Sequence, residues 1–181
     1  MSLIKASYSV RRGKAYAGQI ADTSNYNIDG TCVCGNAKIL IGKIVALEPS
    51  QKVVDGHKVV TDVIDTSAAN PNLVGAVIMS HAYSPTGEYE EGTAINVMTH
   101  GRAWVLCKKD LQSDVGEFNK QVFIDASGVV VASGTGLGTV YTTTGEWLKT
   151  NHADYDIVKI QLTQAQFQLP ASGGSTPGGE A

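Results

Sequence analysis

Apolar and polar residues alternate in short runs along most of the chain, and a helical period of 3.6 residues is hard to find. The runs are rich in Val, Ile, Thr and Tyr, and Gly, Asp, Asn and Pro separate them. Such runs between turn residues are typical of strands. The pattern therefore predicts an all-β fold, either a single β-sandwich or a β-barrel-like domain.

Two β-hairpins have clear local signals. In "KVVDGHKVV", Asp55-Gly56 separates two apolar pairs, and Asp-Gly favours the positive φ angles of a type I′ turn. In "VFIDASGVVVA", residues 125–128 would connect a strand at 122–124 to a strand at 129–132.

Longer strands are predicted at residues 72–83 and 93–107. In the second, the apolar positions change parity after His100-Gly101, which predicts a bulge or bend at the glycine. Residues 158–162 alternate apolar and polar, so we expect a closing strand with one buried face. Residues 108–118 are predicted to form a short helix or a loop excursion, which Gly116 limits in length.

The two ends of the chain differ from its centre. Residues 1–30 show neither the helical period nor strict alternation, and we interpret them as an extended N-terminal arm. Residues 31–169 form the predicted β-rich core domain. Residues 170–181 are rich in Gly, Ser and Pro, a composition typical of a flexible tail.

Charge and apolar content narrow the function classes. The net charge is −3, without the basic stripe that nucleic-acid binding usually requires, so we expect no nucleic-acid partner. No apolar run approaches the roughly 20 residues of a membrane helix, and we expect no membrane partner. The first residues lack the apolar core of a secretion signal, which favours synthesis in a cytoplasm and reduced cysteines.

Candidate metal and catalytic residues lack a convincing motif. No His-x-x-x-His motif relates the four histidines, which are His57, His81, His100 and His152. A zinc site from Cys32, Cys34, Cys107 and His81 or His100 stays an alternative. However, one residue separates the first two cysteines, whereas structural zinc sites use two to four. We therefore prefer buried, reduced cysteines and expect no metal or cofactor.

Three further patterns also have structural interpretations. The spacing Gly134-x-Gly136-x-Gly138 lacks the following helix of a phosphate-binding loop, and turn formation explains it better. Five carboxylates lie in polar segments, where a solvated face is the preferred interpretation: Asp62, Asp65, Glu88, Glu90 and Glu91. Three aromatic residues are candidates for a glycan-binding platform, with core packing as the alternative for the second: Tyr83, Trp104 and Trp147.

Several segments, in this order, carry a family resemblance. "AYAGQIAD" precedes "ILIGKIVAL", then "LVGAVIMSHAY" is followed by "GTAINVMTHGRAWV", and "QVFIDASG" by "EWLKTNHADYDIVKIQL". Together they resemble the structural cement, or capsid decoration, proteins of tailed bacteriophages. Residues 108–120 and the C-terminal tail depart from the family pattern, so they inherit no role from it.

The resemblance implies a virion protein without enzymatic activity or cofactor. Such a protein binds the capsid exterior, clamps neighbouring subunits of the major capsid protein and forms a dimer or trimer. We expect the arm to bind coat protein or a sister subunit, with packing on its own body as the alternative. The candidate interface residues are Arg11, Arg12, Lys14, Tyr16, Gln19, Asp22 and Tyr26.

Three other functions stay open at this point. A head-tail or tail component of a phage would share the β-rich body. A glycan-binding β-domain would use the aromatic residues named above, and a hydrolase would depend on His81 or His100.

Overall fold

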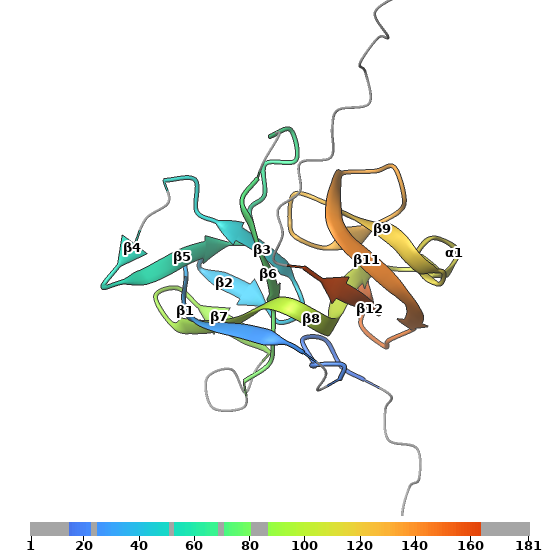
Figure 1. Ribbon diagram of the computed structural model, residues 1–181, viewed down its shortest axis with the longest axis horizontal. Helices are drawn as coiled ribbons and strands as arrows, with labels where there is room; N and C mark the ends of the chain where they lie inside the picture. Colours follow the sequence, from blue (N-terminus) through green and yellow to red (C-terminus); the bar gives the residue numbers. More distant parts are fainter. Residues whose placement is uncertain (1–14, 23–24, 51–52, 69–70, 81–86, 164–181) are drawn as a thin grey trace, which may run out of the picture.

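The computed structural model describes residues 15–22, 25–50, 53–68, 71–80 and 87–163. Within these ranges the chain forms twelve strands and one short helix, which confirms the all-β prediction (Figure 1). The strands close into two barrels, so the fold is barrel-like.

The first barrel contains β1 (Asn27–Cys34), β3 (Ile44–Leu47), β5 (His57–Thr61), β6 (Leu73–Val77) and β8 (Ala94–Lys108). Strand β1 pairs in parallel with β5, and β5 pairs antiparallel with β3. The circuit continues antiparallel from β3 to β6 and from β6 to β8, and β8 pairs again with β1. These five strands therefore form a closed ring.

The second barrel uses β8 again, together with β9 (Phe118–Ile124), β10 (Val130–Val131), β11 (Leu137–Leu148) and β12 (Tyr155–Leu162). Its pairings run from β8 to β10, β9, β11 and β12, and β12 returns to β8. The predicted closing strand is thus confirmed as β12. In Figure 1 the second barrel lies on the right, the first lies on the left, and β8 runs between them.

Strand β8 changes its partner at Gly101. Residues 94–100 pair with β1, and residues 101–108 pair with β12 on the same edge of β8. Gly101 has a φ of +108°, and an added Cβ would lie 2.7 Å from Tyr26 Cβ. The bend predicted here is confirmed, and it lets one strand serve both barrels.

Three smaller elements complete the fold. Strand β4 (Val53–Val54) pairs with β5 through a turn in which Asp55 and Gly56 have positive φ, which confirms the first hairpin. Strands β2 (Lys38–Leu40) and β7 (Glu88–Glu90) form a separate antiparallel pair. The predicted short helix is α1 (Gln112–Val115).

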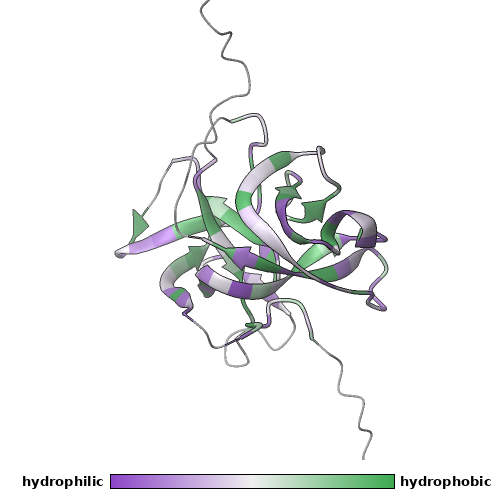
Figure 2. Ribbon diagram, turned by 45° about the vertical axis from the view of Figure 1, so that its right-hand side comes forward, coloured by the Kyte–Doolittle hydropathy of each residue, from purple (hydrophilic) through white to green (hydrophobic). Residues whose placement is uncertain are grey.

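A separate buried cluster lies inside each barrel, since every strand of a barrel contributes to it. Figure 2 shows hydrophobic residues along the strands of both barrels. The first interior also receives residues from β2 and β7, and it comprises Cys32, Cys34, Ile39, Ile41, Val45, Val60, Val77, Tyr89, Ile95 and Val97. The second interior comprises Ala103, Val105, Cys107, Val122, Ile124, Val130, Tyr141, Val158, Ile160 and Leu162.

The two barrels also pack directly on each other. Ile44, Ala76 and Met98, from the strands of the first barrel, belong to the same cluster as the interior of the second. The predicted second hairpin, β9 to β10, reaches across this contact. Its Gly128 carbonyl accepts a hydrogen bond from the Ile44 N–H at 2.8 Å, and an added Cβ at Gly128 would lie 2.0 Å from Ile44 O.

Several sequence boundaries change in the structure. The strand expected at 72–83 ends at Val77 as β6, and residues 81–86 lie outside the described residues. Strand β1 begins at Asn27, so the end of the predicted arm at residue 30 falls inside a strand. Residues 1–14 and the predicted tail lie outside the described residues.

Candidate functional site

Residues 15–22, called the strap below, add to the free edge of β8 within the second barrel. Gly18 N–H donates to Trp104 O at 2.7 Å, and Trp104 N–H donates to Gln19 O at 2.9 Å. Ala21 N–H then donates to Arg102 O at 2.8 Å. Of the interpretations left open above, packing on its own body is thus the correct one for these residues.

Close backbone contacts hold the strap in place. Gly18 has a φ of +71°, and a Cβ added there would lie 1.9 Å from Ile41 Cγ2. Ala15, Ala17 and Ala21 pack against a cluster that includes Trp104 on the outer face of the barrel. Small residues are therefore required in the strap because its backbone runs directly over other segments.

The predicted interface residues have different surroundings. Asp22 forms an ion pair with Arg102 at 3.2 Å, and the Gln19 side chain accepts a hydrogen bond from Tyr16 N–H at 3.2 Å. These two polar side chains thus have partners inside the chain. Three predicted residues lie outside the described residues, namely Arg11, Arg12 and Lys14.

Two aromatic residues of the prediction are exposed, one in the strap and one beside the bend of β8. Tyr16 is 49% exposed and Tyr26 is 43% exposed. Tyr26 lies over Gly101, while Tyr16 belongs to the strap that pairs with the neighbouring residues of β8. Exposed aromatic side chains are enriched where proteins bind each other. Phe118 and Val63 are also strongly exposed, and sequence reasoning missed them because no pattern singles them out.

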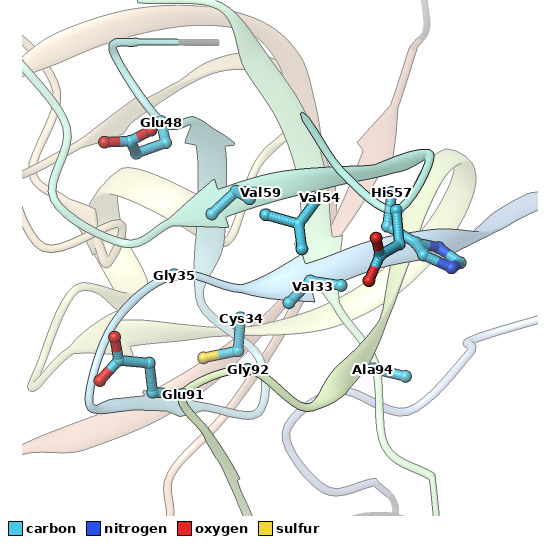
Figure 3. Close-up of a pocket in the computed structure, with 11 residues that line it drawn as sticks. Val33, Cys34, Gly35, Glu48, Val54, His57, Val59, Glu91, Gly92 and Ala94 are labelled. Carbon is cyan, nitrogen blue, oxygen red and sulfur yellow. The ribbon is translucent and has the colours of Figure 1, made fainter. Parts of the chain in front are cut away.

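A groove of about 470 Å³ lies on the outer side of the first barrel, beside the β4–β5 hairpin. In Figure 3, the apolar side chains of Val33, Val54 and Val59 lie near its centre, with Glu48 and Glu91 toward the edge. The remaining described residues that line it are Cys34, Gly35, Asp55, His57, Gly92 and Ala94. The groove is thus apolar at its centre and acidic at its rim, a combination that no sequence motif indicated.

The alternative sites gain little from the structure. Trp104 is only 5% exposed because the strap packs over it, so a glycan platform built on it is wrong. Tyr83 and His81 lie outside the described residues. Burial raises the pKa of the Cys32 thiol to about 11 and that of Cys107 to about 12, so these thiols are poor nucleophiles at neutral pH. The described residues contain no group of three or more His, Cys, Asp or Glu that could hold a metal ion.

Asp62 corrects one sequence interpretation. It was assigned to a solvated face, but it is buried and pairs with Lys43 at 2.6 Å, and Asn36 donates a further hydrogen bond to it. Its partners lie 19 and 26 residues away, so the local sequence does not indicate them. Asp62 therefore has a structural role within the first barrel.

Asp156 anchors the edge of the second barrel. It is fully buried and accepts hydrogen bonds from Lys109 Nζ at 2.9 Å and Thr150 N–H at 2.8 Å, with Asp110 N–H at 3.3 Å. Burial acts to raise the pKa of Asp156, but these donors outweigh burial and lower it. The carboxylate is therefore a charged structural group rather than a proton donor.

Comparison with known proteins decides the family. Residues 4–163 match the model of a family described as "Structural cement protein (E217 gp24/Pam3 gp6)". The chain belongs to this family. Membership gives the protein a capsid-associated structural role in a phage virion, as the resemblance implied. The match includes residues 4–14, ahead of the strap, and ends before the Gly/Ser-rich tail.

A solved structure shares the fold. A chain described under "The capsid of Myoviridae Phage XM1" superposes with a TM-score of 0.58 and 16% sequence identity. The alignment covers 91% of this chain and 99% of that chain. No curated protein matches the sequence significantly. Within the described residues, no helix has the length and apolarity needed to cross a membrane.

Proposed function

We propose that this cement protein binds the outer surface of a phage capsid and clamps adjacent subunits of the major capsid protein. The observation that carries the proposal is the family match across residues 4–163, which includes both barrels and the strap. The proposal also includes a closed homo-oligomer, made in the host cytoplasm, and no enzymatic activity.

The exposed aromatic pair is the proposed contact with coat protein. Tyr16 belongs to the strap, which backbone hydrogen bonds tie to β8, and Tyr26 directly precedes Asn27, which pairs with β8. A rigid contact loses little conformational entropy when it binds, so aromatic side chains there add affinity at low cost. Asp22 and Gln19 position this surface, because their side chains already bind within the chain.

Binding alone performs the function. A cement protein that binds the assembled shell and not dissociated coat subunits stabilises the shell by mass action, by an amount that grows with its concentration relative to its Kd. An oligomer with several such contacts gains further through the high effective concentration of the second contact. No chemical step is needed.

Co-sedimentation with decoration-free mature capsids tests the proposal. The full chain should bind at a fixed, saturable ratio to coat protein. The double substitution Tyr16→Ala/Tyr26→Ala should weaken binding about tenfold or more, as expected for buried aromatic contacts. A deletion of residues 1–30 is unsuitable because it removes the strap and the first part of β1.

The matched control replaces two exposed apolar residues elsewhere, Phe118→Ala/Val63→Ala, and should bind as the unmodified chain does. If only the control variant loses affinity, the contact surface is elsewhere. If the unmodified chain does not bind capsids but sediments with purified tails, the capsid proposal is wrong and the protein is a tail component.

A further inference from the structure

The groove of the first barrel has a chemistry that selects its occupant. Its centre is apolar, and Glu48, Asp55 and Glu91 lie at its lining. Among the described residues, none of these three carboxylates forms an ion pair, and no Lys or Arg lines the groove. A segment that combines aliphatic and basic side chains would complement both parts of it.

The N-terminal residues have this composition. Residues 1–14 read "MSLIKASYSVRRGK", with four basic residues, several aliphatic ones and no Asp or Glu. Because the whole chain carries −3 and this segment +4, residues 15–181 carry −7. The family match begins at residue 4, so most of this segment belongs to the family's common sequence rather than to an appended tail.

The geometry places three of the four basic residues of the same chain out of reach of the groove. Arg11, Arg12 and Lys14 are at most four residues from Ala15, so their backbone lies within roughly 14 Å of it. Ala15 packs near Trp104, whereas the groove reaches Ala94, ten residues earlier on β8 and therefore roughly 30 Å away along the strand. Figure 1 shows the first described residues, in dark blue, at the lower right and the β4–β5 hairpin at the far left.

We infer that the groove of one copy binds residues 1–14 of a neighbouring copy. Aliphatic side chains of the segment fill the apolar centre, and its basic side chains pair with the carboxylates at the rim. Arg11, Arg12 and Lys14 thereby link one copy to the next, and the decoration becomes a linked layer. The inference rests on the proposed function in one respect: binding to a shell brings the copies close together.

Disulfide trapping between two full-length variants tests this exchange. One variant carries Ser9→Cys and the other carries Ala94→Cys in the groove. Both also carry Cys34→Ser, because Cys34 lines the groove, while Cys32 and Cys107 are buried. Mixing them under mild oxidation, free and on saturated capsids, should yield a cross-linked pair. Replacing Ala94→Cys by Asp154→Cys, an exposed position on the second barrel, should not.

Charge exchange makes the test specific. Glu48→Lys/Glu91→Lys in the groove variant should reduce cross-linking about tenfold, and Arg11→Glu/Arg12→Glu in the partner should restore it. The control Glu117→Lys/Asp154→Lys makes the same change in net charge away from the groove and should leave cross-linking unchanged.

Three results overturn the inference. The first is cross-linking no greater than in the Asp154→Cys control, both in solution and on capsids. The second is a bond within one chain of a Ser9→Cys/Ala94→Cys double variant, without linked pairs. The third is loss of capsid binding by the Glu48→Lys/Glu91→Lys variant without any linked copies, which assigns the groove to coat protein and leaves the proposed function intact.

Discussion

The two barrels share β8, but the chain covers the outer face of only one of them. The second barrel is covered by the strap, which pairs with β8 and packs over Trp104. The first barrel leaves an apolar groove with an acidic rim beside the β4–β5 hairpin. A face that the chain covers itself contributes to stability, whereas a face that it leaves open is available to a partner. The second barrel is therefore expected to govern stability and the first to govern association between copies.

Breaking the contact between the barrels should have the largest effect. Gly128 has a φ of +72°, and a Cβ there would lie 2.0 Å from the Ile44 carbonyl oxygen. Because a backbone atom blocks the side chain, Gly128→Ala should reduce the free energy of unfolding by about 3 kcal/mol or more. Urea unfolding measures this change.

Gly134 is the matched control for this substitution. It has a φ of +77° with nothing within 4 Å of an added Cβ. Gly134→Ala therefore has only the backbone cost, about 1 kcal/mol. Equal losses for both variants would show that backbone conformation, and not the contact between the barrels, accounts for the effect.

Removing the buried carboxylate should destabilise the second barrel alone. Asp156→Ala leaves two backbone N–H groups without their acceptor and removes the ion pair of Lys109, which keeps only the Thr150 carbonyl. The free energy of unfolding should fall by about 3 kcal/mol. Asp154→Ala, an exposed neighbour, should change it by less than about 0.5 kcal/mol. Hydrogen exchange should show the loss of protection first in β12, and protection lost equally in β1 would contradict the comparison.

Acid should weaken both barrels through their carboxylates. The pKa values of Asp29, in the first barrel, and of Asp125 and Asp156, in the second, lie below the ordinary value of 3.8. Burial acts to raise the pKa of each carboxylate. Hydrogen bonds to the carboxylate, including one from a lysine in each case, outweigh burial and lower the pKa. The stability that these carboxylates contribute is complete above their pKa in the unfolded chain. It is lost as pH falls through their lower pKa values in the folded protein.

Unfolding midpoints measured from pH 6 down to pH 2 check this sign. Stability should fall steeply below about pH 4, and Asp156→Ala should flatten the curve. A curve of unchanged steepness in that variant would mean that Asp156 does not contribute to acid sensitivity.

The smallest expected effect concerns the ion pair of the strap. Asp22 and Arg102 are both partly exposed, so Asp22→Asn should reduce the free energy of unfolding by no more than about 0.5 kcal/mol. The backbone hydrogen bonds to β8 should still hold the strap. Hydrogen exchange at the Ala21 amide is the measurement. If this amide loses protection in the variant, the ion pair, and not the backbone hydrogen bonds, holds the strap on β8.

Local chemistry made part of this fold predictable. Asp55-Gly56 determined one hairpin, and Gly101 marked the bend of β8. The parity change expected there was wrong, because the residues of β8 that line the interiors are odd-numbered in both barrels. Pairings between distant residues were beyond such reasoning. The strap looked free because its partners on β8 lie about 80 residues away, and Asp62 looked solvated because Lys43 is not its neighbour in sequence. The groove likewise forms only when β1, β5 and the start of β8 come together.

The shared strand also sets an order of folding during synthesis. Every strand of the first barrel has emerged once the chain reaches Lys108, whereas the second barrel cannot close until Leu162. The first barrel can therefore form while the second half of β8 still presents an unpaired edge. That exposed interval, when nascent chains are prone to aggregate, ends only when β12 arrives.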